Sequence, residues 1–77
     1  MPKSLRSPRH QQFLDQLVTL RKAQGLTQAQ IAEKLSRPQS FVAKYEGGER
    51  RLDVVEFLDV TAALGADPCE ILSKLRS

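Results

Sequence analysis

The sequence predicts a small all-α domain of five short helices, and three observations support that fold class. Apolar residues recur at spacings of three and four along the 77 residues, and no segment alternates with a period of two. Capping residues or prolines mark each expected helix start, and glycines follow three of the expected helix ends. A chain of this length can bury one modest core, so we expect one domain over residues 8–77.

The first helix is expected to begin after Ser7, an N-cap residue, with Pro8 at its first position. It should run to about Gln24 and end at Gly25 in the left-handed conformation. Its apolar face consists of Phe13, Leu14, Leu17, Val18 and Leu20. Residues 1–7 are basic and without periodicity, which predicts a mobile arm. The arm either follows DNA phosphates or is simply a frayed terminus. His10, in the first turn, is interpreted as a surface residue.

Two further helices are expected around a tight turn. Thr27 and Gln30 form a capping box, and an apolar face of Ile31, Ala32 and Leu35 follows. Residues 36–38 interrupt this pattern, and Pro38 is best placed in the first turn of the next helix, where its missing N–H costs nothing. In that helix Val42 and Tyr45 point toward the core, with Phe41 and Glu46 beside them, and Gly47 and Gly48 stop it.

The last two helices also carry local start signals. Asp53 and Glu56 form a second capping box for a helix over about residues 54–64, which Gly65 ends. Asp67, Pro68 and Glu70 together open the final helix. Its apolar residues and those of residues 54–64 exceed the needs of a small core, which predicts a second interface. The alternative is that they complete the core. Cys69 is interpreted as a small buried hydrophobic residue.

The composition excludes several classes of protein. One cysteine and one histidine cannot form a disulfide or a zinc site, and no Gly-rich phosphate loop or cluster of catalytic residues is present. We therefore expect no enzyme activity, no metal and no cofactor. No apolar run approaches the roughly 20 residues that span a bilayer, and no secretory signal precedes the domain. The expected location is the cytoplasm, in association with the nucleoid.

The charge is unevenly distributed in a way that suits a polyanionic partner. The formal net charge is +3, from 12 basic and 9 acidic residues. Residues 1–51 hold ten of the basic and four of the acidic residues, whereas residues 52–77 hold two and five. The basic part includes the expected helix pair at residues 27–46. One side of the molecule is thus predicted to attract a polyanion such as DNA.

The outward face of residues 39–46 has the chemistry of a base-reading helix. Gln39, Ser40, Ala43 and Lys44 share this face, which contains no acid. Gln can bond adenine through two contacts, Lys can donate to guanine, and Ser can bond either. The small side chain of Ala43 permits close approach. The alternative is a polar face that only contacts water.

Residues 26–35 and 41–48 resemble the helix-turn-helix of the Cro/C1-type (XRE-like) transcriptional regulators, and the resemblance extends from about residue 17 to residue 75. It implies a five-helix, lambda-repressor-like DNA-binding domain. The chain departs from the family pattern at Ser36, where the family usually has Gly, and at Arg37, where it usually has an apolar residue.

The resemblance and the residue chemistry together predict two sets of DNA contacts and one ion pair within the protein. Expected base contacts are Gln39, Ser40, Lys44 and Phe41, although Phe41 either touches a thymine methyl or finishes the core edge. Expected contacts to the DNA backbone are Thr27, Gln28, Arg37, Gly48, Arg50 and Arg51; the alternative for the last two is a solvated loop. Glu46 lies at a helix C-terminus, where the helix dipole disfavours an acid, so it is expected to need a cation. The resemblance implies Arg21 as that partner; the alternative is that Glu46 is an ordinary exposed residue.

The expected function is a sequence-specific transcriptional regulator, of repressor or controller type, that reads a palindromic site on double-stranded DNA as a homodimer. The candidate dimer interface consists of Val55, Leu58, Ile71, Leu72 and Leu75. The alternative is a helical protein-interaction module, such as an antitoxin-like partner-binding domain, that uses the same fold without reading DNA.

Overall fold

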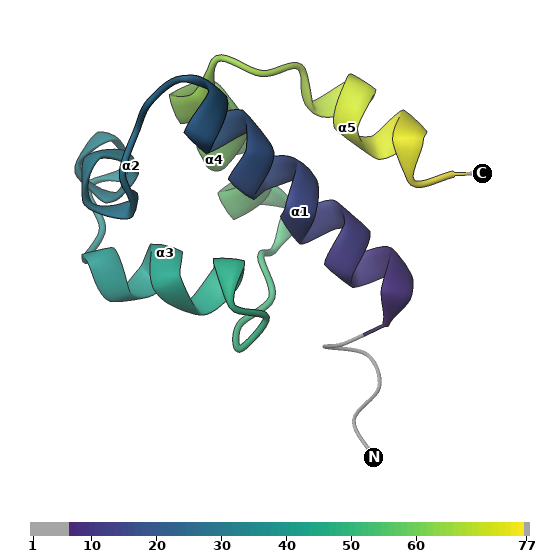
Figure 1. Cartoon of the computed structure of the whole chain (residues 1–77), viewed down its shortest axis with the longest axis horizontal. Coiled ribbons are helices and arrows are strands. Elements are labelled where there is room, and N and C mark those ends of the chain that lie inside the picture. Colours follow the sequence, from purple (N-terminus) through teal and green to yellow (C-terminus); the bar gives the residue numbers. More distant parts are fainter. Residues whose placement is uncertain (1–6, 77) are drawn as a thin grey trace.

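The computed structural model describes residues 7–76, which form five α-helices and no β-strand. In chain order these are α1 (Pro8–Ala23), α2 (Gln28–Leu35), α3 (Gln39–Glu46), α4 (Val54–Leu64) and α5 (Pro68–Lys74) (Figure 1). The predicted all-α fold class is therefore confirmed. The predicted N-terminal arm falls, except for Ser7, outside the described residues. None of the described helices is long and apolar enough to cross a membrane.

The helix starts follow the local capping signals. The Ser7 hydroxyl accepts a hydrogen bond of 3.1 Å from the His10 N–H at the start of α1. Thr27 and Gln30 bond each other's backbone N–H groups at the start of α2, at 3.1 and 2.8 Å. Each of these bonds satisfies an N–H that a helix start otherwise leaves without a partner. Helix boundaries at these positions are consequently set by residues within one turn of them.

The turn between α2 and α3 places a serine in a conformation that glycine adopts more readily. Ser36 adopts the left-handed conformation (φ 56°, ψ 42°). Among residues 7–76 it is the only residue other than glycine with a positive φ. This conformation costs an L-residue roughly 1–2 kcal/mol relative to glycine, before differences in the unfolded chain. Pro38 is extended (ψ 152°) and occupies the position before α3, which begins at Gln39, without a side-chain capping hydrogen bond. The prediction that Pro38 lies inside the first turn is therefore wrong by one residue, because the chain must turn there.

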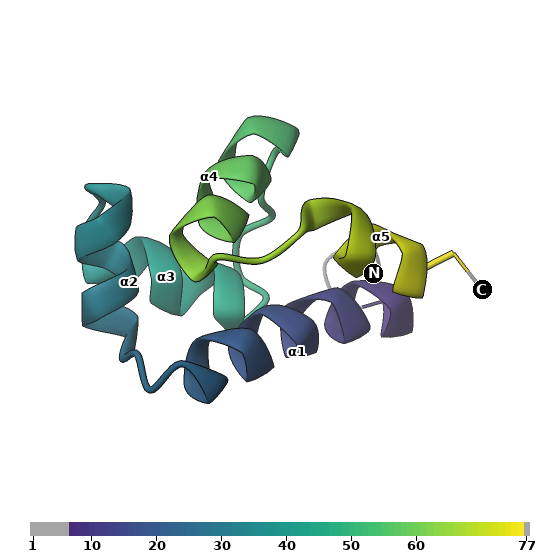
Figure 2. The ribbon, with the colours of Figure 1, turned by 90° about the horizontal axis from the view of Figure 1, so that it is seen from above.

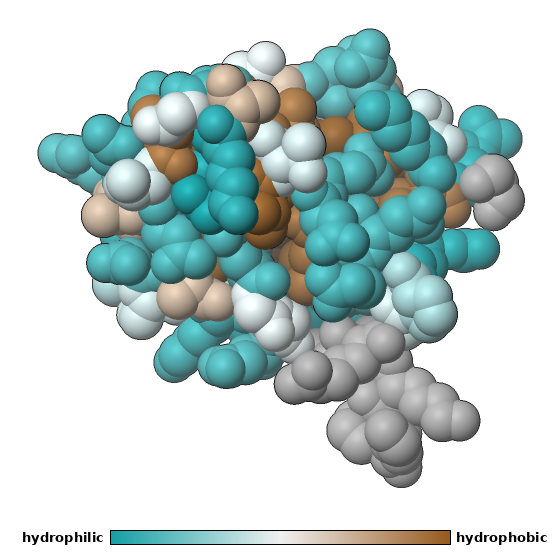
Figure 3. Space-filling view, viewed as in Figure 1, coloured by the Kyte–Doolittle hydropathy of each residue, from teal (hydrophilic) through white to brown (hydrophobic). Residues whose placement is uncertain are grey.

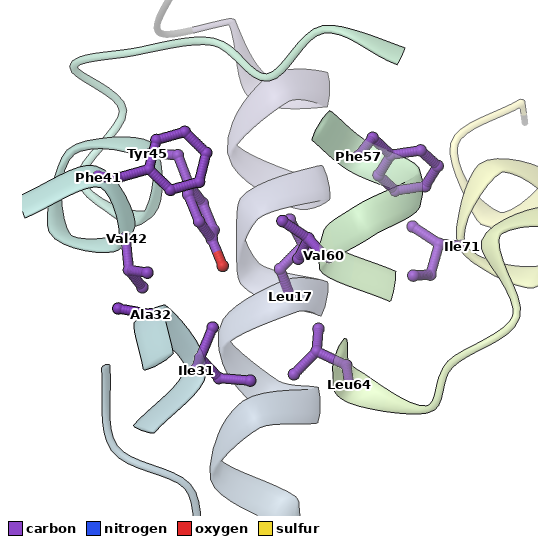
Figure 4. Close-up of a cluster of buried hydrophobic side chains, with 10 residues drawn as sticks. All are labelled: Leu17, Ile31, Ala32, Phe41, Val42, Tyr45, Phe57, Val60, Leu64 and Ile71. Carbon is purple, nitrogen blue, oxygen red and sulfur yellow. The ribbon is translucent and has the colours of Figure 1, made fainter. Parts of the chain in front are cut away.

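One hydrophobic core joins all five helices. Figure 4 shows Leu17 of α1 between side chains from α2 and α3 on one side and side chains from α4 and α5 on the other. The buried hydrophobic residues are Leu14, Leu17, Ile31, Ala32, Phe41, Val42, Tyr45, Phe57, Val60, Leu64 and Ile71. Because α3 contributes three of them, its orientation is fixed by packing and its opposite face points outward.

The C-terminal helices leave several of their apolar residues exposed. Val54 and Val55 are 75% and 67% exposed, because the first turn of α4 stands away from α1 (Figure 2). Ile71, by contrast, is 3% exposed within the core, so its assignment to a dimer interface is wrong. Cys69 is exposed on α5, so its interpretation as a buried residue is also wrong. Burial here depends on how the helices lie against one another.

Candidate nucleic-acid interface

The helix α3 lies at the edge of the ribbon in Figure 1, and the exposed residues on its outward face are mainly polar. Gln39, Ser40, Ala43 and Lys44 are all exposed, whereas Val42 and Tyr45 on the opposite face are 0% and 1% exposed. Lys44 takes part in no ion pair within residues 7–76. The exposed side chains on α3 can therefore donate and accept hydrogen bonds at an approaching surface without first breaking contacts of their own.

Phe41 lies in the core and does not share this exposed face. Its residue is 8% exposed, and its ring meets the Tyr45 ring edge-on with centroids 5.4 Å apart. The guanidinium carbons of Arg37 and Arg50 lie 4.5 and 5.0 Å from the Phe41 ring centroid. Such contacts stabilise a cation over an aromatic face. Of the two roles considered for Phe41, its position favours the one at the edge of the core.

Arg21 and Glu46, which were expected to pair, form two hydrogen bonds between α1 and the end of α3. Arg21 Nε lies 2.8 Å from Glu46 Oε2, and Arg21 Nη2 lies 3.1 Å from Glu46 Oε1. Their side chains are only 11% and 6% exposed. The Arg21 Nη1 group also donates to the Leu26 carbonyl at 2.8 Å, which ties the turn before α2 to the same site. This network fixes how α3 is positioned relative to α1.

The ionisable groups around this pair respond to it. The hydrogen bond to Glu46 raises the pKa of Arg21 above its ordinary value, against the opposing effect of burial. Burial raises the pKa of the Tyr45 hydroxyl, and the neighbouring Glu46 carboxylate raises it further. Both Arg21 and Tyr45 thus keep their protons throughout the physiological range. The Arg21–Glu46 pair is therefore a structural support for α3.

The start of α2 is adjacent to the same network. The Gln28 side-chain amide donates to Glu46 Oε1 at 2.9 Å, so it is engaged within the protein. Thr27 is exposed, and its hydroxyl caps the Gln30 N–H. The first backbone N–H groups of α2 remain the part of this segment suited to a phosphate, because a helix N-terminus carries a partial positive charge. Of the Gln28 groups that could contact a phosphate, the side-chain amide is thus already bonded to Glu46.

A second ionic cluster, which was not predicted from the sequence, links the segment after α3 to α4. Both terminal nitrogens of Arg50 donate to the Glu56 carboxylate, at 2.9 and 2.8 Å, and Arg37 Nη2 lies 3.5 Å from Glu56 Oε2. Glu56 is 8% exposed and also accepts the Asp53 N–H at 3.0 Å within the predicted capping box. Only the six-residue spacing between Arg50 and Glu56 could have suggested this contact.

Arg51 lies beside the start of α1 and close to His10. Arg51 is exposed and makes no ion pair within residues 7–76. Burial lowers the pKa of His10, and the nearby Arg51 charge lowers it further. His10 is half-buried, and its Nε2 is buried without a hydrogen-bond partner in the described part of the chain. Its interpretation as a simple surface residue is therefore wrong, because its ring packs near Phe13, with centroids 5.9 Å apart.

A groove of about 590 Å³ lies between α1 and α5, away from the polar face of α3. Asp15, Asp67 and Glu70 line it together with a single cation, Lys74. An excess of carboxylates repels phosphates, so this groove does not suit DNA. Figure 3 shows a mainly hydrophilic surface on this view of the molecule, with hydrophobic residues visible between the polar ones.

The arrangement defines a helix-turn-helix domain: α2 packs across α3, and α3 presents an acid-free face. A family model described as a helix-turn-helix domain matches residues 12–72. A solved structure titled "XRE-family like protein", from Pseudomonas syringae pv. tomato str. DC3000, is 51% identical; the match covers 95% of this chain and 89% of that chain, with a TM-score of 0.86. No curated protein matches the chain.

This chain belongs to the XRE-like helix-turn-helix family, whose members are DNA-binding regulators. The predicted resemblance of residues 26–35 and 41–48 to the XRE-like helix-turn-helix is therefore confirmed. The departure at Ser36 from the family's usual glycine is accommodated by a left-handed serine, and the departure at Arg37 places a guanidinium over Phe41.

Proposed function

We propose that this protein is a sequence-specific transcriptional regulator, of repressor or controller type, that binds a palindromic operator as a homodimer and inserts α3 into the major groove. The observation that carries the proposal is the exposed, acid-free face of α3 opposite its buried face. An α-helix fits the major groove of B-DNA, where each base pair presents a distinct pattern of donors and acceptors. The site of action would be the nucleoid in the cytoplasm.

Gln39, Ser40 and Lys44 are the proposed base readers. All three are exposed and lie around Ala43, whose small side chain lets the helix backbone approach the bases. Gln39 and Ser40 are the first two residues of α3, and N-terminal residues of a recognition helix commonly reach base edges. Phe41 is left out of this set, since it is 8% exposed and lies beneath two guanidinium groups.

The DNA backbone would be held by groups that precede and follow α3 in the chain. Before it lie Thr27 and the N-terminal N–H groups of α2, to which Gln28 contributes its backbone. Arg37 at the turn before α3 and Arg51 in the loop after it, both exposed, would add two cations. Gly48, which the sequence also suggested as a backbone contact, is buried and is left out of this set. Arg37 keeps 44% of its side chain exposed despite its contact with Glu56. Contacts of this kind position a protein on DNA without reading its sequence.

A homodimer would use apolar surface on the C-terminal helices. Val55 and Leu58 on α4 are 67% and 48% exposed, and Leu72 on α5 is 48% exposed. Leu75, three residues after Leu72, is half-buried. Residues 52–77 are also net acidic, so an interface there would not compete for phosphates. A two-fold dimer would place two copies of α3 about 34 Å apart, one turn of B-DNA, on a palindromic site.

Selection of duplexes from a random pool by the purified protein tests this function. We expect one enriched palindromic sequence, and we expect Gln39→Ala and Lys44→Ala each to weaken binding to it by about 1–3 kcal/mol, with much smaller losses on random DNA. Lys74→Ala, on α5, is the matched control and should leave both affinities nearly unchanged. Equal losses on selected and random DNA would show that Gln39 and Lys44 are not base readers.

The dimer is tested by sedimentation at micromolar concentration, with Leu72→Glu beside the unmodified protein. We expect a dimer that Leu72→Glu converts to a monomer, because a carboxylate in an apolar interface must lose its hydration. A protein that stays monomeric and binds a single half-site with full affinity would refute the homodimer.

The exposed Val54 and Val55 side chains favour one other function, a helical interaction module that binds a partner protein without reading DNA. An antitoxin-like domain is one such module. The two functions differ in a simple mobility shift. Binding to duplex DNA that weakens with salt is expected for the regulator. No binding even at low salt would favour the interaction module.

A further inference from the structure

The adjacent cations Arg50 and Arg51 follow α3, yet they have different surroundings. The guanidinium of Arg50 makes three contacts: two hydrogen bonds to Glu56, at 2.9 and 2.8 Å, and one to the Arg51 carbonyl at 3.0 Å. Its carbon also lies 5.0 Å from the Phe41 ring centroid. These contacts join the segment after α3 both to α4 and to the aromatic edge of the core.

Glu56 is itself held in place. Its carboxylate accepts the Asp53 N–H at 3.0 Å, while its own N–H donates to the Asp53 carboxylate at 2.7 Å. Only 10% of its side chain is exposed. The hydrogen bond from Arg50, together with that from the Asp53 N–H, lowers the pKa of Glu56 to about 2. The carboxylate is therefore charged near neutrality, and it is fixed to the first turn of α4.

The two arginines consequently differ in what a phosphate contact would require. If Arg50 moved to a phosphate, it would break two charge-assisted hydrogen bonds and leave the little-exposed Glu56 carboxylate near a second anion. Arg51 is exposed and has no ion-pair partner in residues 7–76. A phosphate contact by Arg51 would break no ion pair within that part of the chain.

We propose that Glu56 is a positioning residue that distinguishes the two arginines: it holds Arg50, whose side chain is 40% exposed, in a two-bond contact with α4, and it leaves Arg51 as the cation that contacts the phosphate backbone. The inference rests on the proposed DNA-binding function and narrows it, because Arg50 is removed from the phosphate contacts that the sequence predicted. It also gives Glu56 a second role besides capping α4.

The salt dependence of binding to random duplex DNA tests the proposal directly. Each cation that meets a phosphate adds about 0.9 to the slope of log affinity against log salt. Arg51→Ala should lower the magnitude of the slope by about this amount. Arg50→Ala should leave the slope unchanged, while the midpoint of thermal unfolding falls because the contact with Glu56 is lost. If Arg51 had only a structural role, Arg51→Ala would leave the slope unchanged.

Two further variants keep the test decisive if Arg50→Ala does not fold. Glu56→Gln retains an oxygen for the Asp53 N–H but loosens Arg50, so the slope should steepen by up to one phosphate contact, about 0.9. Glu49→Gln adds the same charge at an exposed acid that makes no ion pair in the described residues, and serves as the matched control. Adding Arg50→Ala to Glu56→Gln should remove the gain.

The possible outcomes separate this inference from the function on which it rests. An unmodified protein that binds no duplex at low salt would refute both. If the unmodified protein binds DNA in a salt-dependent manner but Arg50→Ala lowers the slope as much as Arg51→Ala, the role of Glu56 is refuted and the DNA-binding function is not. Equal slopes for Glu56→Gln and Glu49→Gln would likewise overturn it.

Discussion

Breaking the Arg21–Glu46 pair should destabilise the whole domain, because the pair holds α1 and α3 together. Arg21→Met removes three donors, two to Glu46 and one to the Leu26 carbonyl. The Glu46 side chain, 6% exposed, would keep only the Gln28 amide as a side-chain donor in residues 7–76. Leaving one charge of a buried pair without its partner costs about 3–5 kcal/mol.

Glu46→Gln should cost less, about 2–3 kcal/mol, since it keeps the shape and one acceptor oxygen but loses charge-assisted bonds. For a domain of this size, 1 kcal/mol corresponds to about 4–8 °C in the midpoint of thermal unfolding. Arg21→Met should therefore lower that midpoint by at least about 12 °C.

Urea unfolding of the two single variants and the double variant measures the coupling. The double variant buries neither charge, so its loss should fall short of the summed single losses by about 2 kcal/mol or more. A matched cycle pairs Lys22→Met, at an exposed neighbour on α1, with Glu46→Gln and should show almost no coupling. Single losses for Arg21 and Glu46 that add to within about 0.5 kcal/mol would refute the reasoning.

Three other results are expected from stability measurements. Because the pKa of Glu56 is about 2 in the folded protein against an ordinary 4.5, its stabilising effect is complete above about pH 4.5 and is lost as the pH falls toward 2; urea midpoints of Glu56→Gln should lack this part of the acid sensitivity. Ile71→Ala should lower the free energy of unfolding by about 2–5 kcal/mol, whereas Leu72→Ala should lower it by under about 1 kcal/mol in the monomer. Similar losses for the two variants would contradict the burial of Ile71 and the exposure of Leu72 on α5. Ser36→Gly should raise the free energy of unfolding by about 0.5–1 kcal/mol, and with it the midpoint of thermal unfolding, since glycine adopts φ 56° without strain; a lower midpoint would argue against a strained turn.

Helix positions could be predicted because their signals lie within a few residues of one another. Ser7, Thr27 and Asp53 cap helices through bonds to N–H groups three residues later, so the sequence contains both partners side by side. The outward face of α3 was predictable for a similar reason. A rotation of about 100° per residue separates Val42 and Tyr45 from Ala43 and Lys44 whatever the rest of the chain does.

The ionic contacts were predictable only in part. The position of Glu46 at a helix C-terminus indicated that it needed a cation, and the family resemblance indicated Arg21 as its partner. Nothing comparable distinguished Arg50 from Arg51. Their surroundings depend on how the first turn of α4 lies against the loop after α3, and a sequence pattern contains no measure of that distance.

Burial at the C-terminal end was decided by tertiary packing. Ile71 and Leu72 are adjacent and equally apolar, yet one is 3% and the other 48% exposed. Their side chains point about 100° apart on α5, so only the docking of α5 against α1 and α4 selects which one enters the core. The same reason applies to Val54, which is apolar but 75% exposed at the start of α4, the end of that helix that stands away from α1 in Figure 2. Local sequence thus determined where the helices of this protein begin, end and turn their polar faces, whereas burial and charge pairing between distant segments were decided when the helices packed.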